Sequence, residues 1–221
     1  MIEFANLRNH NQCPNGVYVI PLPENINIWY GVLFIHKGYY KGAVLKFRID
    51  IPISYPNSSP SVTFLTDVFH PLVDKNGQLN LEFKFPSWTP RYDHIIDILK
   101  FIKSCFKVAV LNNITEEATF NKQAYQLYNN EPHLFARLSQ QCTRLSQSEQ
   151  VAFENPEEDN PINFIPLTNN KFEELYPQFL GPTGSKIIHG TSNSLKQTSS
   201  LDNVISNIKK SVSTNINKLF D

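Results

Sequence analysis

The sequence has little cysteine, no excess of either charge and no long apolar run. Its three cysteines, Cys13, Cys105 and Cys142, are odd in number and widely spaced. That pattern excludes a disulfide framework and a cysteine-based zinc site, and it favours a reducing compartment. Twenty basic residues balance twenty acidic ones, so no long-range field attracts nucleic acid, an anionic membrane or an acidic substrate.

No apolar stretch approaches the roughly 20 residues needed to cross a bilayer. The first residues also lack the charged and then apolar pattern of a signal peptide. We therefore expect a cytoplasmic protein with no nucleic-acid partner, no cofactor and no metal, and with at most an indirect association with membranes. The 221 residues, 41% of them hydrophobic, are enough for one substantial core with appended segments.

Strand patterns dominate the first third of the chain. Residues 44–51 are the clearest case, because Leu45, Phe47 and Ile49 alternate with charged residues. This alternation predicts one buried face and one exposed face. The four expected strands are residues 17–20, 29–35, 44–51 and 62–65. Since they follow one another closely, they predict an antiparallel meander, preceded by a short helix within residues 1–12.

Helical patterns follow a long irregular stretch at residues 68–90, and loops of that length are often functional. The first helical stripe comprises Ile95, Leu99, Ile102, Phe106 and Ala109, with Ile98 and Cys105 beside it. Thr115, followed by two acids, resembles a helix start, and Pro132 interrupts that helix. The last stripe comprises Leu134, Leu138, Cys142 and Leu145. Strands followed by helices predict an α+β fold over residues 1–150.

The composition changes after residue 150. Residues 151–180 contain aromatic segments that we expect to dock on the domain, and residues 181–200 are a linker rich in Ser, Thr and Asn. Residues 201–221 have the pattern of an amphipathic helix. Its apolar face supplies candidate binding residues, Leu201, Val204, Ile205, Ile208, Val212 and Ile216. Two interpretations stay open for it: it folds back on the domain, or it binds a partner or a bilayer surface.

A set of motifs runs through the loops between the strands and the helices. The motifs are Pro52-x-x-Tyr55-Pro56 with Pro60 and Phe64, then His70-Pro71, then Gly77, then Trp88-Thr89-Pro90. In this order and at these distances they resemble the ubiquitin-conjugating-enzyme family over residues 1–147. The resemblance implies a four-stranded meander with an N-terminal helix and C-terminal helices.

The active-site positions depart from that family. The His-Pro-Asn turn reads His70-Pro71-Leu72, and Asn80 stands where the resemblance places the cysteine nucleophile. A carboxamide cannot form the thioester that the chemistry requires, and leucine offers no donor to an oxyanion. The site is therefore expected to be degenerate. The simplest interpretation makes Asn80 a solvent-facing loop residue, while His70 fixes the loop and Trp88 packs it against the core.

Residues 16–19, 29–35 and 68–74 are more specifically similar to the Akt-interacting protein, or Fused Toes, family of inactive variants, in which Leu72 belongs to the pattern. The resemblance implies an adaptor that assembles with a Hook-like coiled-coil protein and an FHIP-like protein, in dynein-driven transport at endosomal or vesicle membranes. The alternative is a variant that binds ubiquitin or pairs with an active conjugating enzyme. An active ubiquitin-conjugating enzyme is the interpretation that the residues favour least.

Overall fold

The computed structural model describes residues 2–7, 12–153, 159–168 and 171. The chain divides into two compact units, Met1–Ile165 and Pro166–Asp221. All the helices and strands named below lie in the first unit. The predicted linker at 181–200 and the predicted amphipathic helix at 201–221 lie outside the described residues.

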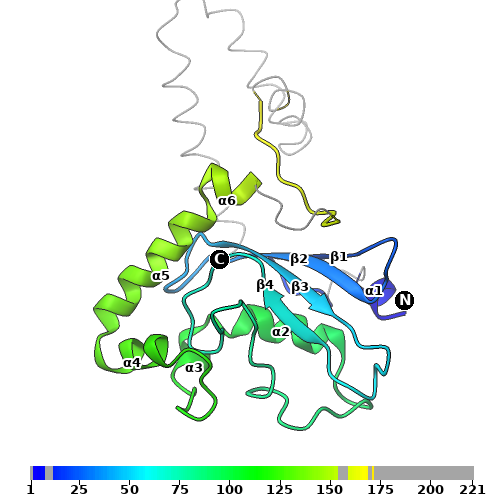
Figure 1. The fold of residues 1–221 in the computed structure, drawn as a ribbon, viewed down its shortest axis with the longest axis horizontal. Coiled ribbons are helices and arrows are strands. Elements are labelled where there is room, and N and C mark those ends of the chain that lie inside the picture. Colours follow the sequence, from blue (N-terminus) through cyan, green and yellow to red (C-terminus); the bar gives the residue numbers. More distant parts are fainter. Residues whose placement is uncertain (1, 8–11, 154–158, 169–170, 172–221) are drawn as a thin grey trace, which may run out of the picture. The chain divides into compact units, whose positions relative to one another are not determined.

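Four antiparallel strands form one sheet in the order β1-β2-β3-β4, which confirms the predicted meander (Figure 1). The strands are β1 Val17–Pro21, β2 Ile28–Phe34, β3 Val44–Asp50 and β4 Ser61–Phe64. Across the sheet Tyr18 lies opposite Val32, and Val32 lies opposite Lys46. Because side chains alternate between faces, these three residues share one face, which we call the outer face.

The inner face of the sheet forms the core together with helix α2, Ile95–Ser104. Its buried side chains include Val17, Trp29, Leu33, Leu45, Phe47, Ile49, Val62 and Phe64. Gly31 leaves space for the Phe47 ring, since a Cβ at Gly31 would lie 2.3 Å from that ring. The buried face of α2 contains the predicted residues Ile95, Ile98, Leu99 and Ile102, and also Phe101.

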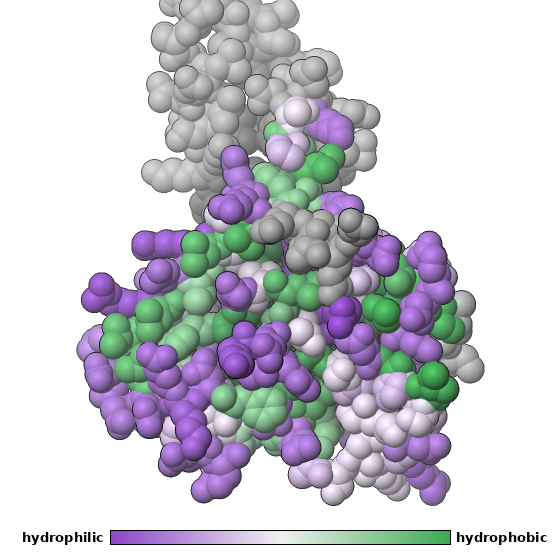
Figure 2. Space-filling model, in the orientation of Figure 1, coloured by the Kyte–Doolittle hydropathy of each residue, from purple (hydrophilic) through white to green (hydrophobic). Residues whose placement is uncertain are grey.

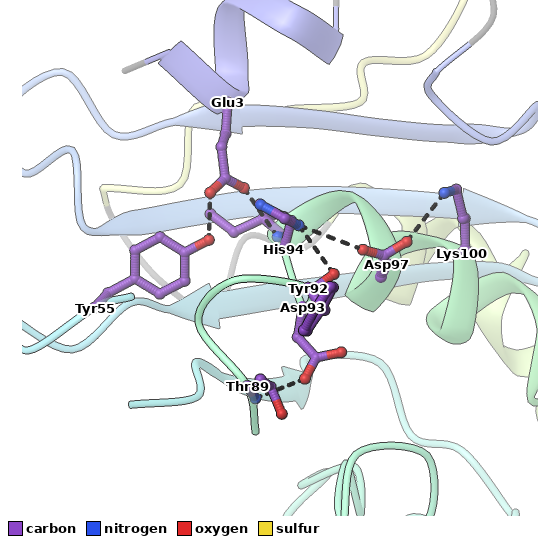
Figure 3. A network of polar contacts seen from close by, with 9 residues as sticks. Glu3, Tyr55, Thr89, Tyr92, Asp93, His94, Asp97 and Lys100 are labelled. Carbon is purple, nitrogen blue, oxygen red and sulfur yellow. Dashed lines mark hydrogen bonds and ion pairs between the residues drawn. The ribbon is translucent and has the colours of Figure 1, made fainter. Parts of the chain in front are cut away.

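Helix α1, Ile2–Leu7, is joined to α2 by the Glu3 carboxylate (Figure 3). Glu3 accepts the backbone N–H of Ile95 at 2.9 Å, in the first turn of α2, and also accepts the Tyr55 hydroxyl. Burial and the neighbouring carboxylate raise the pKa of Tyr55, so its phenol stays a proton donor. Further contacts in this network join Thr89 to Asp93, His94 to Asp97 and Lys100 to Asp97.

The C-terminal helices are α3 Val108–Leu111, α4 Lys122–Asn130, α5 Pro132–Ser146 and α6 Glu149–Phe153. The predicted helix start at Thr115 is wrong, because Asn121 caps α4 by accepting the Ala124 N–H at 3.0 Å. The predicted break at Pro132 is confirmed, and Pro132 begins α5. The helix predicted from the first apolar stripe is too long at its C-terminal end. Helix α2 ends at Ser104, and Ala109, the last residue of the predicted stripe, is exposed.

Helix α5 buries a different face from the predicted one. Leu134 and Leu145 are 36% and 50% exposed, and apolar surface follows α5 in the space-filling view (Figure 2). The buried residues of the helix are Phe135, Ser139, Thr143 and Ser146. These small hydroxyl residues let the helix approach β3, where the Ser146 hydroxyl accepts the Val44 N–H at 3.1 Å. Close backbone approach, rather than leucine packing, therefore orients α5.

The exposed outer face predicted for residues 44–51 is wrong at Lys46, whereas the Arg48 and Asp50 side chains on the same face are 31% and 36% exposed. Lys46 points to that face but is only 4% exposed. Its ammonium donates to the backbone carbonyls of Val151 and Ala152 in α6. The covering helix lies about a hundred residues further along the chain, so strand periodicity alone did not reveal it.

Candidate functional site

The His70 ring is fully buried at the start of the long loop and bonds to the backbone on both sides. Its Nδ1 accepts the Leu72 N–H at 3.0 Å, and its Nε2 lies 3.1 Å from the carbonyl of Cys105. These partners assign the proton to Nε2, since the carbonyl can only accept. Burial lowers the pKa of His70 to about 4, so the ring is neutral at pH 7. The predicted loop-fixing role of His70 is confirmed.

Leu72 lies fully buried in the core and connects the segment that follows His70 to the segment that contains Asn80. Its carbonyl accepts the backbone N–H of Asn80 at 2.8 Å. Between these segments a tight turn places Gly77 with φ +84° beside β4. A Cβ there would lie 2.1 Å from the carbonyl oxygen of Phe64, so only glycine fits.

Asn80 is not the solvent-facing residue that the sequence favoured. It is 6% exposed and uses both ends of its carboxamide. The Nδ2 donates to the carbonyl of Ala118 at 2.7 Å, and the Oδ1 accepts the N–H of Glu82 at 3.0 Å. The carbonyl of Pro71 accepts the N–H of Phe120 at 3.0 Å, which brings the loop containing Ala118 into reach. Asn80 therefore joins two loops that are far apart in sequence.

None of the three cysteines has the setting of a reactive thiolate. Cys105 is buried, and desolvation raises the pKa of its thiol strongly. Burial also raises the pKa of Cys13 and Cys142, which are partly exposed. A nucleophilic cysteine needs the opposite shift. The thiols therefore behave as protonated packing groups at neutral pH.

Trp88 holds the proline-rich corner against the end of the loop. Its indole N–H donates to the carbonyl of Pro56 at 2.7 Å. Its ring lies 5.7 Å from that of Phe85 and 6.2 Å from that of Tyr55. The predicted packing role of Trp88 is confirmed, since its half-buried ring packs against the core and the polar end of the indole is hydrogen-bonded.

Among the described residues, no three His, Cys, Asp or Glu side chains gather as a metal site would need. No described helix is long and apolar enough to cross a membrane. The candidate binding residues Leu201, Val204, Ile205, Ile208, Val212 and Ile216 lie outside the described residues and stay a prediction.

Comparison with known proteins agrees with the motifs. The family model described as ubiquitin-conjugating enzyme matches residues 2–143. The protein crossbronx homolog of Culex quinquefasciatus is 33% identical over 201 residues, which cover 90% of this chain and 83% of that protein. The AKT-interacting protein of Danio rerio is 34% identical over 163 residues, covering 72% and 53%. The chain belongs to the AKT-interacting protein family of ubiquitin-conjugating-enzyme variants.

The alignments cover different shares of the relatives' own lengths. The crossbronx homolog of Anopheles gambiae is 39% identical over 150 residues, but these cover only 65% of its length. The chain thus spans about half of the Danio rerio protein and most of the Culex one. The match to the family model ends at residue 143, so α6 and the segment after it lie beyond the part that the family model matches.

Proposed function

We propose that this protein is a non-catalytic adaptor subunit. It assembles with a Hook-like coiled-coil protein and an FHIP-like protein, and it links vesicle or endosome cargo to dynein-driven transport. It is cytoplasmic and reaches endosomal or vesicle membranes through these partners. The observation that carries the proposal is Asn80, which we place at the nucleophile position of the conjugating fold.

The role of Asn80 supports a binding function in two ways. A carboxamide cannot attack the activated ubiquitin terminus or carry it as a thioester. Its two hydrogen bonds also tie residues 80–82 to Ala118, in a place where a conjugating enzyme needs an accessible nucleophile. Leu72, buried in the core, supplies no side-chain donor for an oxyanion. On this proposal the chain keeps the conjugating fold, and the residues at the position of the reaction centre stabilise the loop.

Restoring the cysteine should not restore the reaction. We expect Asn80→Cys to form no reductant-sensitive ubiquitin adduct after incubation with ubiquitin-activating enzyme and ATP. The thiol would be nearly buried, and the oxyanion donor would still be missing at Leu72. The variant should also be less stable by about 1–3 kcal/mol, because the Ala118 carbonyl and the Glu82 N–H lose their partner.

The measurement is non-reducing gel electrophoresis, with an active conjugating enzyme as the positive control. A reductant-sensitive adduct on the Asn80→Cys variant would show that the site is still competent apart from its nucleophile. Such an adduct on the wild-type protein would refute the non-catalytic proposal itself.

The adaptor role is tested by affinity purification of the full chain from cells, followed by mass spectrometry. We expect Hook-like and FHIP-like chains to be recovered. A matched chain with Val204→Asp, Ile208→Asp and Val212→Asp tests the candidate binding residues, and loss of both partners would locate the interface there. Recovery of ubiquitin or an active conjugating enzyme, without a Hook-like protein, would contradict the adaptor role and favour ubiquitin signalling.

A further inference from the structure

Part of the outer face of the sheet is covered by the chain itself, although Tyr18 on the same face is 61% exposed. Tyr30, Val32 and Lys46 all point to this face, and each is only 4% exposed. A sheet with one solvated face would leave these positions open. Helix α6 and residues 159–165 belong to the same compact unit as the sheet. The contacts of Lys46 and Phe164 show how this C-terminal part covers the face.

Lys46 anchors the covering residues by its ammonium. The Nζ donates to the carbonyl of Ala152 at 2.8 Å and lies 3.4 Å from the carbonyl of Val151. Both carbonyls belong to α6, whose C-terminal end carries a partial negative charge. A buried ammonium is costly unless it is hydrogen-bonded, so these contacts explain why a lysine is tolerated on this face.

Phe164 adds an aromatic anchor next to this lysine. Its ring centroid lies 6.4 Å from that of Phe34 at an interplanar angle of 76°, an edge-to-face contact. The Lys46 Nζ lies 5.5 Å from the same ring, within the range of a cation–π interaction. The ring of Tyr18 also packs edge-to-face with that of Phe34, at a centroid distance of 5.9 Å. The ring of Phe164 therefore contacts both the Phe34 ring and the Lys46 ammonium.

Residues 159–165 have the exposure pattern of an extended peptide, and Phe164 is the residue through which they contact this surface. Exposure alternates along them: Asn160 is buried, Ile162 and Phe164 are half-buried, and Pro161 and Asn163 are exposed. This period of two is that of an extended segment with one face against a surface. The Asn160 side chain accepts the Ile162 N–H at 2.9 Å, which shapes the segment locally.

We propose that the outer face of the sheet is a peptide-binding surface which the chain fills with its own residues 159–165. Its ligand class is an extended peptide with an aromatic residue at the position of Phe164. The anchor is one half-buried ring, but covalent linkage gives it an effective concentration of the order of millimolar. A partner peptide of the same chemistry therefore binds when the cis segment is released or outcompeted.

The test uses the full chain and a fluorescent peptide with the sequence of residues 159–165. Phe164→Ala removes the cis anchor, and Ile165→Ala is the matched control because Ile165 is 62% exposed. By fluorescence anisotropy, the peptide should bind Phe164→Ala at least about tenfold more tightly than wild type or Ile165→Ala. A peptide with alanine at the Phe164 position should bind at least about tenfold more weakly.

A second variant tests the receiving surface. In the Phe164→Ala background, Lys46→Met keeps an apolar stem but removes the ammonium, and it should weaken peptide binding severalfold. Circular dichroism checks that each variant is folded. Equal binding to all chains, no binding up to millimolar peptide, or unchanged affinity in the Lys46→Met background would each overturn the proposal.

Discussion

Replacing Phe135 with alanine is expected to lower the free energy of unfolding by about 3–5 kcal/mol. The Phe135 side chain is fully buried. Its ring is surrounded by those of Tyr128 at 5.1 Å, Tyr39 at 5.3 Å, Phe69 at 5.9 Å and Tyr40 at 6.2 Å. These neighbours come from a strand connection, the long loop and α4, so they cannot all close the cavity. Guanidinium denaturation measures the loss.

The adjacent residue supplies the control. Leu134→Ala, one position earlier on α5, should cost less than about 1 kcal/mol, because Leu134 is 36% exposed. The two variants remove apolar groups from neighbouring positions of one helix, so helix propensity does not explain a large difference. Equal costs, or a larger cost at Leu134, would show that α5 packs by the leucine face that periodicity predicted.

The error over α5 has a physical origin. Periodicity detects where leucines recur, and Leu134, Leu138 and Leu145 recur at helical spacing. It does not detect that small hydroxyl residues permit close approach to a strand. Two of the hydroxyls bond within the helix itself: Thr143 donates to the carbonyl of Ser139 at 3.0 Å, and Ser146 donates to that of Thr143 at 2.7 Å. Such residues form a buried face with no hydrophobic signature.

Local sequence patterns were sufficient to predict the sheet. The four strands are neighbours in sequence, and each predicted strand lies within a residue or two of the observed one. The motifs around His70 and Trp88 also sufficed to predict the loop that they fix. The contacts of Lys46 and Asn80 were not predictable in the same way, because their partners lie 105 and 38 residues away along the chain.

His70 and Asn80 share one property: their side chains bond to backbone groups. Asn80 bonds to the carbonyl of Ala118 and the N–H of Glu82, and His70 to the carbonyl of Cys105 and the N–H of Leu72. Side chains bonded in this way fix the conformation of a loop, and their polar atoms are not available to a substrate. For His70, burial leads in addition to a measurable dependence of stability on pH.

Acidification from pH 7 to pH 4 should cost the protein about 3 kcal/mol through His70 alone. Burial lowers the pKa of His70 from 6.5 to about 4 in the folded chain, whereas the unfolded chain keeps the ordinary value. Between these two values the unfolded chain binds a proton that the folded chain rejects. The stabilisation is therefore complete above about pH 6.5 and is lost as the pH falls toward 4.

Urea unfolding of the wild type and of His70→Asn across this range measures the effect. The carboxylates titrate in both proteins, so the difference between the two profiles isolates His70. The variant should be less stable at pH 7, because it loses a buried ring with two backbone partners. Its profile should nevertheless be flatter, and the two curves should converge toward pH 4. Parallel profiles would mean that the folded protein accommodates a protonated His70, which is incompatible with a buried ring whose Nδ1 accepts the Leu72 N–H.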